Sequence, residues 1–490
     1  MRWTAALAAA TILGLVCAPA GHAEDGPDTA AIDHFVRERL ASTRLPGLAL
    51  AVTRGTTTVM LRGYGHDGRG DPLTPDPQLH IASLSKSFTA FAVMRLAEAG
   101  RIDLDRPVRR SLPGFRLADP AGDRITVREL LNQTSGLGDR GFPQIARDEV
   151  TSLAGRVADL RHAHLVDAPG RAFHYSDLNY QVLGRLLEVV TGRPLSAVLR
   201  DEVFAPLGMS ATLAVPTSQD GPRAAPRLAQ GGILLYGFPV GRPELHGLLA
   251  GSSGVITTAR DMTAWLVQHA TGTAPDGRRL LSAAAIRTLH TPPSGVDGGY
   301  AMGWLARTPH RIEHHGVLAT YSADQVVLPG SRTGIALLYP AQNALADTEG
   351  IKEGIVALAT GRHPPGARFP DGRVTAVLLG ALTIGSAALR VRALTRIPRW
   401  TATARARSRW RTLALTVPQI AWPPAVAALA AALPWLIGRT AGRVFSHTQL
   451  FLAMPAIEIW LISAGILGIV LSTARIAALA RRPQRDDRGD

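Results

Sequence analysis

Two side chains in the segment IASLSKSFTA, residues 81–90, could carry out nucleophilic chemistry together. Ser83 and Lys86 are three residues apart, and at the start of a helix this spacing places them on one face. A neutral lysine amine can take the proton of a serine hydroxyl, and burial or nearby positive charge lowers the pKa of a lysine towards that state. The pair therefore predicts acyl transfer to a serine. The competing interpretation of so short a motif is a surface lysine beside an N-cap serine.

The composition of the chain supports the catalytic interpretation. The 490 residues include 53 Lys and Arg residues, and the only two lysines are Lys86 and Lys352. Arginine cannot lose its proton in a protein, so it could not replace a lysine that acts as a base. We interpret the retention of Lys86 as a sign that its task requires a cation that can be deprotonated.

The elements that must position this pair can be predicted from hydrophobic periodicity and turn signals. GLALAVT and TTTVMLRG predict a strand pair near the N-terminus, and SADQVVLP and TGIALLYP predict another near residue 330. Between them, SFTAFAVMRLAEAG predicts a helix that ends at Gly100, and DLNYQVLGRLLEVVTG predicts one that ends at Gly192. We expect an α+β domain whose first and last strands meet in one antiparallel sheet.

Other residues that could take part in the chemistry stand just before these helices and strands. Tyr175 stands just before the helix that ends at Gly192, and His314 and Gly316 stand just before the second strand pair. With these residues the sequence resembles the serine β-lactamase-related hydrolases, a family close to class C β-lactamases, D,D-peptidases and esterases of the same fold. The resemblance covers most of residues 30–345 and rests on seven segments in the family's order: GYGHDG, PLTPDPQLHIASLSKSFTA, ITVRELLNQTSGL, YSDLNYQVLGRLLE, FAPLGMS, GSSGVITTARDM and YAMGW.

The resemblance implies a fold and a set of residue functions. The implied fold is α+β and β-lactamase/D,D-peptidase-like, with an antiparallel sheet flanked by helices and a helical lobe. Ser83 would be the acyl-accepting nucleophile, Lys86 its base partner and Tyr175 a second acid/base group. His314, His315 and Gly316 would stand where the family has K-T-G or H-x-G on the inner edge strand. The backbone N–H groups of Ser83 and Val317 would form an oxyanion hole.

Two residues depart from the family pattern. The second motif normally reads Y-x-N, but here Asp177 takes the place of the asparagine. An ionised aspartate can only accept hydrogen bonds, so binding of an amide carbonyl should be weaker and Lys86 should stay protonated, which shifts proton abstraction towards Tyr175. Asp177 could instead be the N-cap of the following helix. His314 replaces a lysine, so capture of a substrate carboxylate should also be weaker.

The N-terminal segment predicts export. Residues 1–23 combine Arg2, an apolar run and the small-residue end Gly21-His22-Ala23, as in a secretory signal peptide; an N-terminal membrane anchor is the alternative. The only cysteine, Cys17, lies inside this segment, so the mature chain should have no disulfide. We expect a hydrolase domain over residues 26–360 and a Pro- and Gly-rich linker over residues 361–373.

The C-terminal region predicts membrane spans. Residues 374–389, 412–438 and about 450–474 are long apolar runs, uncharged apart from Glu458, and approach or exceed the roughly 20 residues that cross a bilayer. We expect a transmembrane region over residues 374–474 with three spans, or two if the first is too short. A basic tail, residues 475–490, follows.

Arginine placement predicts the topology. Of the net charge of +15, the residues from Val374 to Asp490 carry 15 Arg against four acids, or +11, so the basic surplus belongs to the membrane region and does not indicate a nucleic-acid partner. Residues 390–411 contain eight arginines and no acid, which places this loop in the cytoplasm. The hydrolase domain would then be extracytoplasmic, and the C-terminus of this multi-pass protein of the cell membrane would be cytoplasmic.

The leading hypothesis is a membrane-anchored extracytoplasmic serine hydrolase that acts on an ester or amide through a Ser83 acyl-enzyme. Its partners would be a small-molecule or cell-wall-derived substrate and the lipid bilayer; the oligomeric state stays open. No cofactor or metal is expected, because the histidines lack the spacing of a zinc centre. The alternatives are a penicillin-binding-like envelope sensor with little turnover and, on the strength of Asp177, an inactive membrane scaffold.

Overall fold

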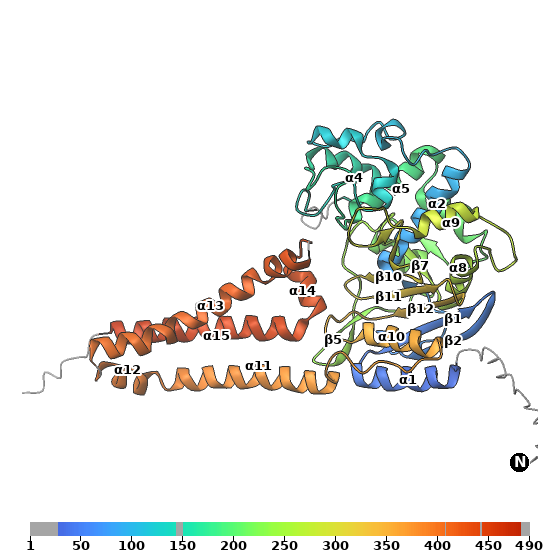
Figure 1. Ribbon diagram of the computed structural model, residues 1–490. Helices are drawn as coiled ribbons and strands as arrows, with labels where there is room; N and C mark the ends of the chain where they lie inside the picture. The colour runs from blue at the N-terminus through green and yellow to red at the C-terminus, as the bar shows by residue number, and fades with distance from the viewer. Residues whose placement is uncertain (1–27, 144–149, 407, 442, 482–490) are drawn as a thin grey trace, which may run out of the picture.

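A seven-stranded antiparallel sheet organises the N-terminal domain in the computed structural model, which describes residues 28–143, 150–406, 408–441 and 443–481 (Figure 1). The expected signal segment, residues 1–23, lies outside the described residues. The strand order is β2-β1-β12-β11-β10-β9-β8. The strands are β1 (Gly47–Arg54), β2 (Thr57–Gly65), β8 (Tyr300–Ala301), β9 (Trp304–Thr308), β10 (Arg311–Val317), β11 (Ser322–Leu328) and β12 (Thr333–Tyr339).

The pairing of β1 with β12 confirms that the two ends of the domain meet in one sheet. The register sets Ala49 opposite Leu338 and Val52 opposite Ile335. The four predicted strands appear as β1, β2, β11 and β12, because each is an apolar run bounded by turn residues.

Each face of the sheet has its own core, because side chains alternate along a strand. Leu48, Leu50 and Val52 of β1 pack under α1 (Thr29–Thr43) and α10 (Thr348–Ala359). Ala49 and Ala51 of β1 belong to the core on the other face, which holds α2 (Ser85–Glu98) and α8 (Ala259–Thr271). Small side chains on this face let α8 pack close to the centre of the sheet.

A helical lobe covers the far side of α2 (Figure 1). The predicted helix that ends at Gly192 is α5, whose last turn closes on that glycine in the left-handed conformation at φ 71°. The lobe comprises α3 (Val127–Leu131), α4 (Leu153–Asp159), α5 (Asp177–Thr191) and α6 (Leu195–Leu199).

Short elements connect the lobe and the sheet. The two small sheets are β3 (Leu79–His80), β7 (Val255–Thr257) and β4 (Leu213–Ala214), and β5 (Gly232–Leu235) with β6 (Phe238–Gly241). The remaining helices and helical turns of this domain are η1 (Ala82–Leu84), η2 (Val108–Arg110), η3 (Pro120–Arg124), η5 (Leu160–His162), η6 (Arg200–Phe204), η7 (Ser218–Asp220), α7 (Gly221–Ala224) and α9 (Ala283–His290).

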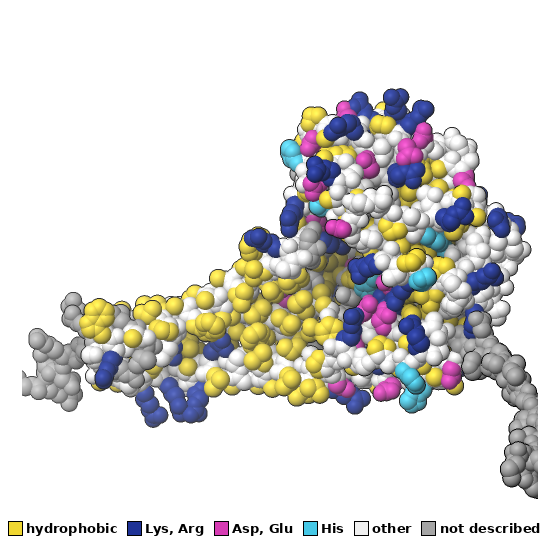
Figure 2. Space-filling model, viewed as in Figure 1, with side chains coloured by type: hydrophobic (Ala, Val, Ile, Leu, Met, Phe, Trp, Pro, Cys, Tyr) yellow, Lys and Arg dark blue, Asp and Glu magenta, His cyan; other side chains and the backbone are white. Residues whose placement is uncertain are grey.

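The C-terminal residues form an arm of helices beside this domain (Figure 1). Three helical stretches, residues 372–395, 416–440 and 455–480, are long and apolar enough to cross a membrane. Yellow apolar side chains cover much of the arm in Figure 2. The arm comprises α11 (Gly372–Thr395), α12 (Ile397–Arg405), α13 (Arg409–Ala441), α14 (His447–Ala453) and α15 (Pro455–Ala480).

The bounds of these helices differ from the apolar runs in the sequence. The first helix, α11, continues past the 16-residue run to Thr395, because Arg390 and Arg392 do not interrupt helical hydrogen bonding. The third run divides at Met454: α14 ends before it, and α15 begins with Pro455 at its first position, where the missing N–H costs no hydrogen bond.

Close packing holds α13 and α15 together. A Cβ atom on Gly468 of α15 would lie 2.4 Å from Pro423 Cβ of α13, so only glycine allows this approach. α15 packs against both α11 and α13. The arm also touches the N-terminal domain, where Ala344 N donates to Ala453 O at 2.9 Å and the hydroxyls of Tyr236 and Thr383 lie 2.9 Å apart.

Candidate active site

Ser83 and Lys86 lie side by side at the start of α2. Ser83 belongs to the one-turn helix η1, and the preceding Ala82 has φ 49°, a left-handed conformation that is strained for a residue with a side chain. The buried Lys86 Nζ lies 3.0 Å from Ser83 Oγ. The loop before β7 is tied to α2 by hydrogen bonds from Val255 N to Ser85 Oγ and from Thr89 Oγ1 to Gly251 O.

The surroundings of Lys86 suit its protonated form. Its Nζ lies 2.5 Å from Asp177 Oδ1 and 3.2 Å from Ser252 O, besides the contact with Ser83. These three acceptors match the three N–H donors of an ammonium group. Burial alone would lower the pKa of Lys86, but the carboxylate of Asp177 and the phenol of Tyr175 outweigh it and raise the pKa above its usual value. The expectation that Asp177 keeps Lys86 protonated agrees with this geometry.

Tyr175 and Asp177 reach the site from the turn that begins α5. Tyr175 lies with its ring centroid 4.9 Å from Lys86 Nζ and 5.8 Å from the ring of Tyr300. Asp177 is the first residue of α5. The N-cap is Ser176, which has an extended backbone and whose side-chain Oγ accepts from Leu178 N. The interpretation of Asp177 as the N-cap is therefore wrong: its carboxylate turns away from the helix towards Lys86.

Gln133 fixes the turn that carries Tyr175, a function that the sequence did not reveal. Its side-chain Oε1 accepts from Ser176 N at 3.0 Å, and its backbone O accepts from His174 N at 2.9 Å. Gln133 itself has φ 60°. Gln133 lies in the segment ITVRELLNQTSGL, which resembles the family. This resemblance marks the segment but does not indicate that Gln133 contacts the turn of Tyr175.

His314 points into the aromatic cluster beneath Tyr175. Its ring centroid lies 6.1 Å from that of Tyr175, its Nδ1 lies 2.8 Å from His315 O, and its Nε2 lies 3.4 Å from the Tyr300 hydroxyl. Burial, together with the positive charge of Lys86, lowers the pKa of His314 to about 3. His314 is therefore neutral at pH 7 and cannot capture a substrate carboxylate as a lysine would.

His315 faces the opposite way and is about half exposed. Its Nδ1 lies 2.9 Å from Asp324 Oδ1. Burial would lower the pKa of His315, but the carboxylate of Asp324 outweighs it and raises the pKa.

Gly316 lets the end of β10 approach the nucleophile. A Cβ atom there would lie 2.4 Å from Ile81 O, so a larger residue would push β10 away from η1. The resemblance implied that His314, His315 and Gly316 lie on an edge strand. In the structure β10 lies between β11 and β9, and β9 pairs with it from Arg311 to Glu313. The pairing with β9 stops at Glu313. Gly316 and Val317, at the end of β10, therefore face η1 instead of β9.

Ser83 and Val317 line the same cavity of about 430 Å³. Asp177 and Gln181 of α5, Glu244 and the segment 245–249 form other parts of its wall. Glu244 accepts from the backbone N–H groups of Ala319 and Thr320 at 3.0 and 2.8 Å, which fixes the turn after β10. The cavity gives a substrate access to Ser83 Oγ.

The arm contributes part of this cavity wall. Arg443, Val444 and Phe445 come from the connection between α13 and α14, and Gln449, Leu450 and Ala453 come from α14. Arg443 Nη2 donates to Asp177 Oδ2 at 2.9 Å. Arg443 could not be recognised as a site residue from the sequence, because it lies 266 residues from Asp177 in a loop without a motif.

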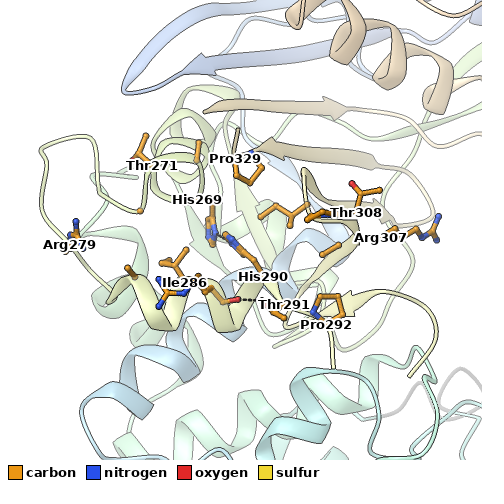
Figure 3. A pocket seen from close by; sticks show the side chains of 17 residues that line it. His269, Thr271, Arg279, Ile286, His290, Thr291, Pro292, Arg307, Thr308 and Pro329 are labelled. Carbon is orange, nitrogen blue, oxygen red and sulfur yellow. Dashed lines mark hydrogen bonds between the residues drawn. The ribbon is translucent and has the colours of Figure 1, made fainter. Parts of the chain in front are cut away.

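A second cavity, of about 650 Å³, lies between α8, α9 and β9 (Figure 3). His269 and His290 face each other there, with Nδ1 and Nε2 2.8 Å apart. Burial lowers the pKa of both histidines, that of His290 to about 3, so the pair is neutral. This cavity is larger than the one at Ser83, but neither Ser83 nor Lys86 lines it, so it is not the candidate active site. Within the described part of the chain, no group of three or more His, Cys, Asp or Glu could hold a metal ion.

Comparisons with known proteins bear on the family and the fold. The sequence model described as Beta-lactamase matches residues 32–378. The chain belongs to the β-lactamase family. It has the β-lactamase/transpeptidase-like α+β fold, with three long apolar helices at its C-terminal end.

The curated relatives come from bacteria. Penicillin-binding protein 4 of Amycolatopsis lactamdurans is 31% identical over 320 residues, which cover 60% of this chain and 80% of that protein. Protein flp of Staphylococcus aureus (strain NCTC 8325 / PS 47) is 27% identical over 318 residues, which cover 63% of this chain and 62% of that protein. The chain thus spans less than two thirds of the length of flp.

Solved structures show the same fold. An octameric penicillin-binding protein homologue from Pyrococcus abyssi aligns with a TM-score of 0.59 at 22% identity, over 72% of this chain and 81% of that one. EstCE1, a hydrolase with promiscuous acyltransferase activity, aligns with a TM-score of 0.55 at 23% identity, over 68% of this chain and 97% of that one.

Proposed function

We propose that this chain is a membrane-anchored extracytoplasmic hydrolase that forms an acyl-enzyme on Ser83 with an ester or amide. The observation that carries the proposal is the 3.0 Å contact between Lys86 Nζ and Ser83 Oγ at the wall of a cavity. Ser83 Oγ bonds to the substrate carbonyl carbon, and the serine proton passes through Lys86 or Tyr175 to the departing alkoxide or amine. Water then releases the acid and restores Ser83.

The oxyanion of each tetrahedral intermediate would be bound by the backbone N–H groups of Ser83 and Val317. Gly316 supports this proposal, since it allows β10 to lie against η1. Such donors stabilise the negative charge that develops in the transition state. Tyr175, whose ring centroid lies 4.9 Å from Lys86 Nζ, would relay the serine proton from Lys86 to the leaving group and give up its own phenol proton as it gains one.

We predict that esters are better substrates than β-lactams or wall peptides. Asp177 cannot donate a hydrogen bond to an amide carbonyl, and His314 is neutral, so the recognition groups for peptides are weakened. Turnover of the purified chain should be measured with short-chain nitrophenyl esters, a D-Ala-D-Ala peptide and a cephalosporin. We expect kcat/KM for the best ester to exceed that of the cephalosporin by about tenfold or more, about 1.4 kcal/mol of transition-state binding. Faster turnover of the cephalosporin would contradict the argument from Asp177.

A penicillin-binding-like sensor is the second candidate. The observation that favours it is the set of three acceptors around Lys86 Nζ, which are Ser83 Oγ, Asp177 Oδ1 and Ser252 O. They favour the ammonium form, and this slows any step that needs a neutral amine. Steady release of nitrophenol after the first turnover supports the hydrolase, whereas a burst equal to the enzyme concentration with no further release supports the sensor.

The arm supports membrane anchoring, and the arginines of residues 390–411 support a cytoplasmic first loop. We expect a cysteine introduced by Ser331→Cys in the hydrolase domain to react with a membrane-impermeant maleimide on intact cells. A cysteine introduced by Thr403→Cys in α12 should react with the same maleimide only after the membrane has been permeabilised with detergent. Reaction of Thr403→Cys in intact cells would contradict the topology.

A further inference from the structure

The connection between α13 and α14 enters the active site from the arm. Figure 1 shows α14 beside the hydrolase domain, and Arg140 Nη2 of the helical lobe lies 3.5 Å from Arg439 O at the end of α13. Arg443 follows within the same connection and lines the Ser83 cavity. A residue of the predicted membrane region thus touches a residue that contacts Lys86.

Two carboxylates hold Arg443 in place. Nη2 lies 2.9 Å from Asp177 Oδ2, and Nε lies 3.7 Å from Asp139 Oδ2. Asp139 is buried, and its Oδ2 also accepts from Val444 N at 3.4 Å. The two carboxylates balance the positive charge of Arg443. Its guanidinium is therefore placed to hold Asp177 and not to bind an anionic substrate.

Asp177 is shared between two cations through its two oxygens. Oδ1 contacts Lys86 Nζ at 2.5 Å, and Oδ2 contacts Arg443. A carboxylate that also binds an arginine attracts the ammonium less than one that binds the ammonium alone, and the guanidinium repels the ammonium directly. Both effects favour the neutral form of Lys86.

The other groups around Lys86 come from several parts of the fold. Ser83 lies in η1, Tyr175 in the turn before α5, Tyr180 in α5 and His314 in β10. Ser252 contributes a carbonyl oxygen. None of these groups supplies a positive charge. Among the described groups that face Asp177, Arg443 is therefore the cation that competes with Lys86.

We propose that Arg443 is a positioning residue of the active site: it holds one oxygen of Asp177 and thereby eases the release of the proton from Lys86. The inference rests on the proposed function, since it concerns the base for Ser83. It makes the loop between the second and third apolar helices part of the catalytic centre, so the arm contributes to catalysis besides anchoring.

The test is the pH dependence of acylation by the full chain in detergent, measured as kcat/KM with a nitrophenyl ester. Activity should rise with pH as Lys86 loses its proton, and Arg443→Ala should move this rise about one pH unit higher. Arg443→Lys, which keeps the charge, should restore part of the shift. Arg439→Ala is the control. It removes an exposed arginine of α13, and its pH profile should be the same as that of the wild type.

Asp177→Asn separates this electrostatic function from a structural one. In that background Arg443→Ala should shift the profile less than it does in the wild type, because the shared carboxylate is gone and only the direct repulsion between the two cations remains. An equal loss of activity at every pH, or the same shift with and without Asp177, would overturn the inference. These outcomes can be distinguished from a failure of the proposed function. If the proposed function is wrong, the Ser83→Ala variant will still hydrolyse the ester.

Discussion

Replacing Ser83 with alanine is expected to lower kcat/KM for ester hydrolysis by at least about 10⁴-fold, because the reaction then loses its nucleophile. Ser83 Oγ is the atom at which the cavity, Lys86 and the end of β10 converge. Binding groups and backbone donors would remain, so substrate affinity should change far less than kcat. Initial rates with a nitrophenyl ester measure the effect.

The matched control is Ser87→Ala, one turn further along α2. Ser87 Oγ donates to Leu84 O at 2.7 Å and accepts from Gln325 Nε2 at 3.1 Å, so the change removes two buried hydrogen bonds. We expect a loss of stability of about 1–2 kcal/mol and activity within about fivefold of the wild type. A Ser83→Ala enzyme that retained a tenth of the activity would exclude Ser83 as the nucleophile.

Lys86→Arg is expected to lower kcat/KM by about 10³-fold, the loss typical of an efficient general base. Arginine keeps the positive charge and can still pair with Asp177, but it cannot accept the serine proton. A plot of activity against pH should also lose the rise that the wild type shows as Lys86 is deprotonated. Retention of more than a tenth of the activity would mean that Lys86 acts only through its charge.

The chain offers Lys352 as a matched control for this substitution. Lys352 is buried in α10 with its Nζ 3.0 Å from Glu313 and 2.8 Å from Glu349, so its function is ion pairing. Arginine can serve that function. Lys352→Arg should therefore leave kcat/KM within about threefold of the wild type, which distinguishes the need for a titratable group from general sensitivity to arginine.

The local part of the site could be predicted because its signals lie close together in the sequence. Ser83 and Lys86 share one helical turn, and a glycine at position 316 is needed where β10 approaches η1. The strands β1, β2, β11 and β12 followed from apolar runs between turn residues. The consequence of Asp177 for Lys86 followed from its chemistry and from its place in a family-like segment.

Other parts depend on tertiary contacts that leave no local signal. Ser176 rather than Asp177 caps α5, because the carboxylate finds a stronger partner in the ammonium of Lys86. Arg443 reaches the site only because the arm packs against the hydrolase domain. In a chain so rich in arginine, neither its type nor its spacing could distinguish Arg443 from its neighbours.

The central claim is that Ser83 becomes acylated, and covalent labelling tests it most directly. The purified chain should be treated with a fluorophosphonate probe for active serine residues, digested and mapped by mass spectrometry. We expect one modified peptide, the one that contains Ser83, and no labelling of Ser83→Ala. Equal labelling of the wild type and Ser83→Ala, or a modification on another serine alone, would contradict the claim.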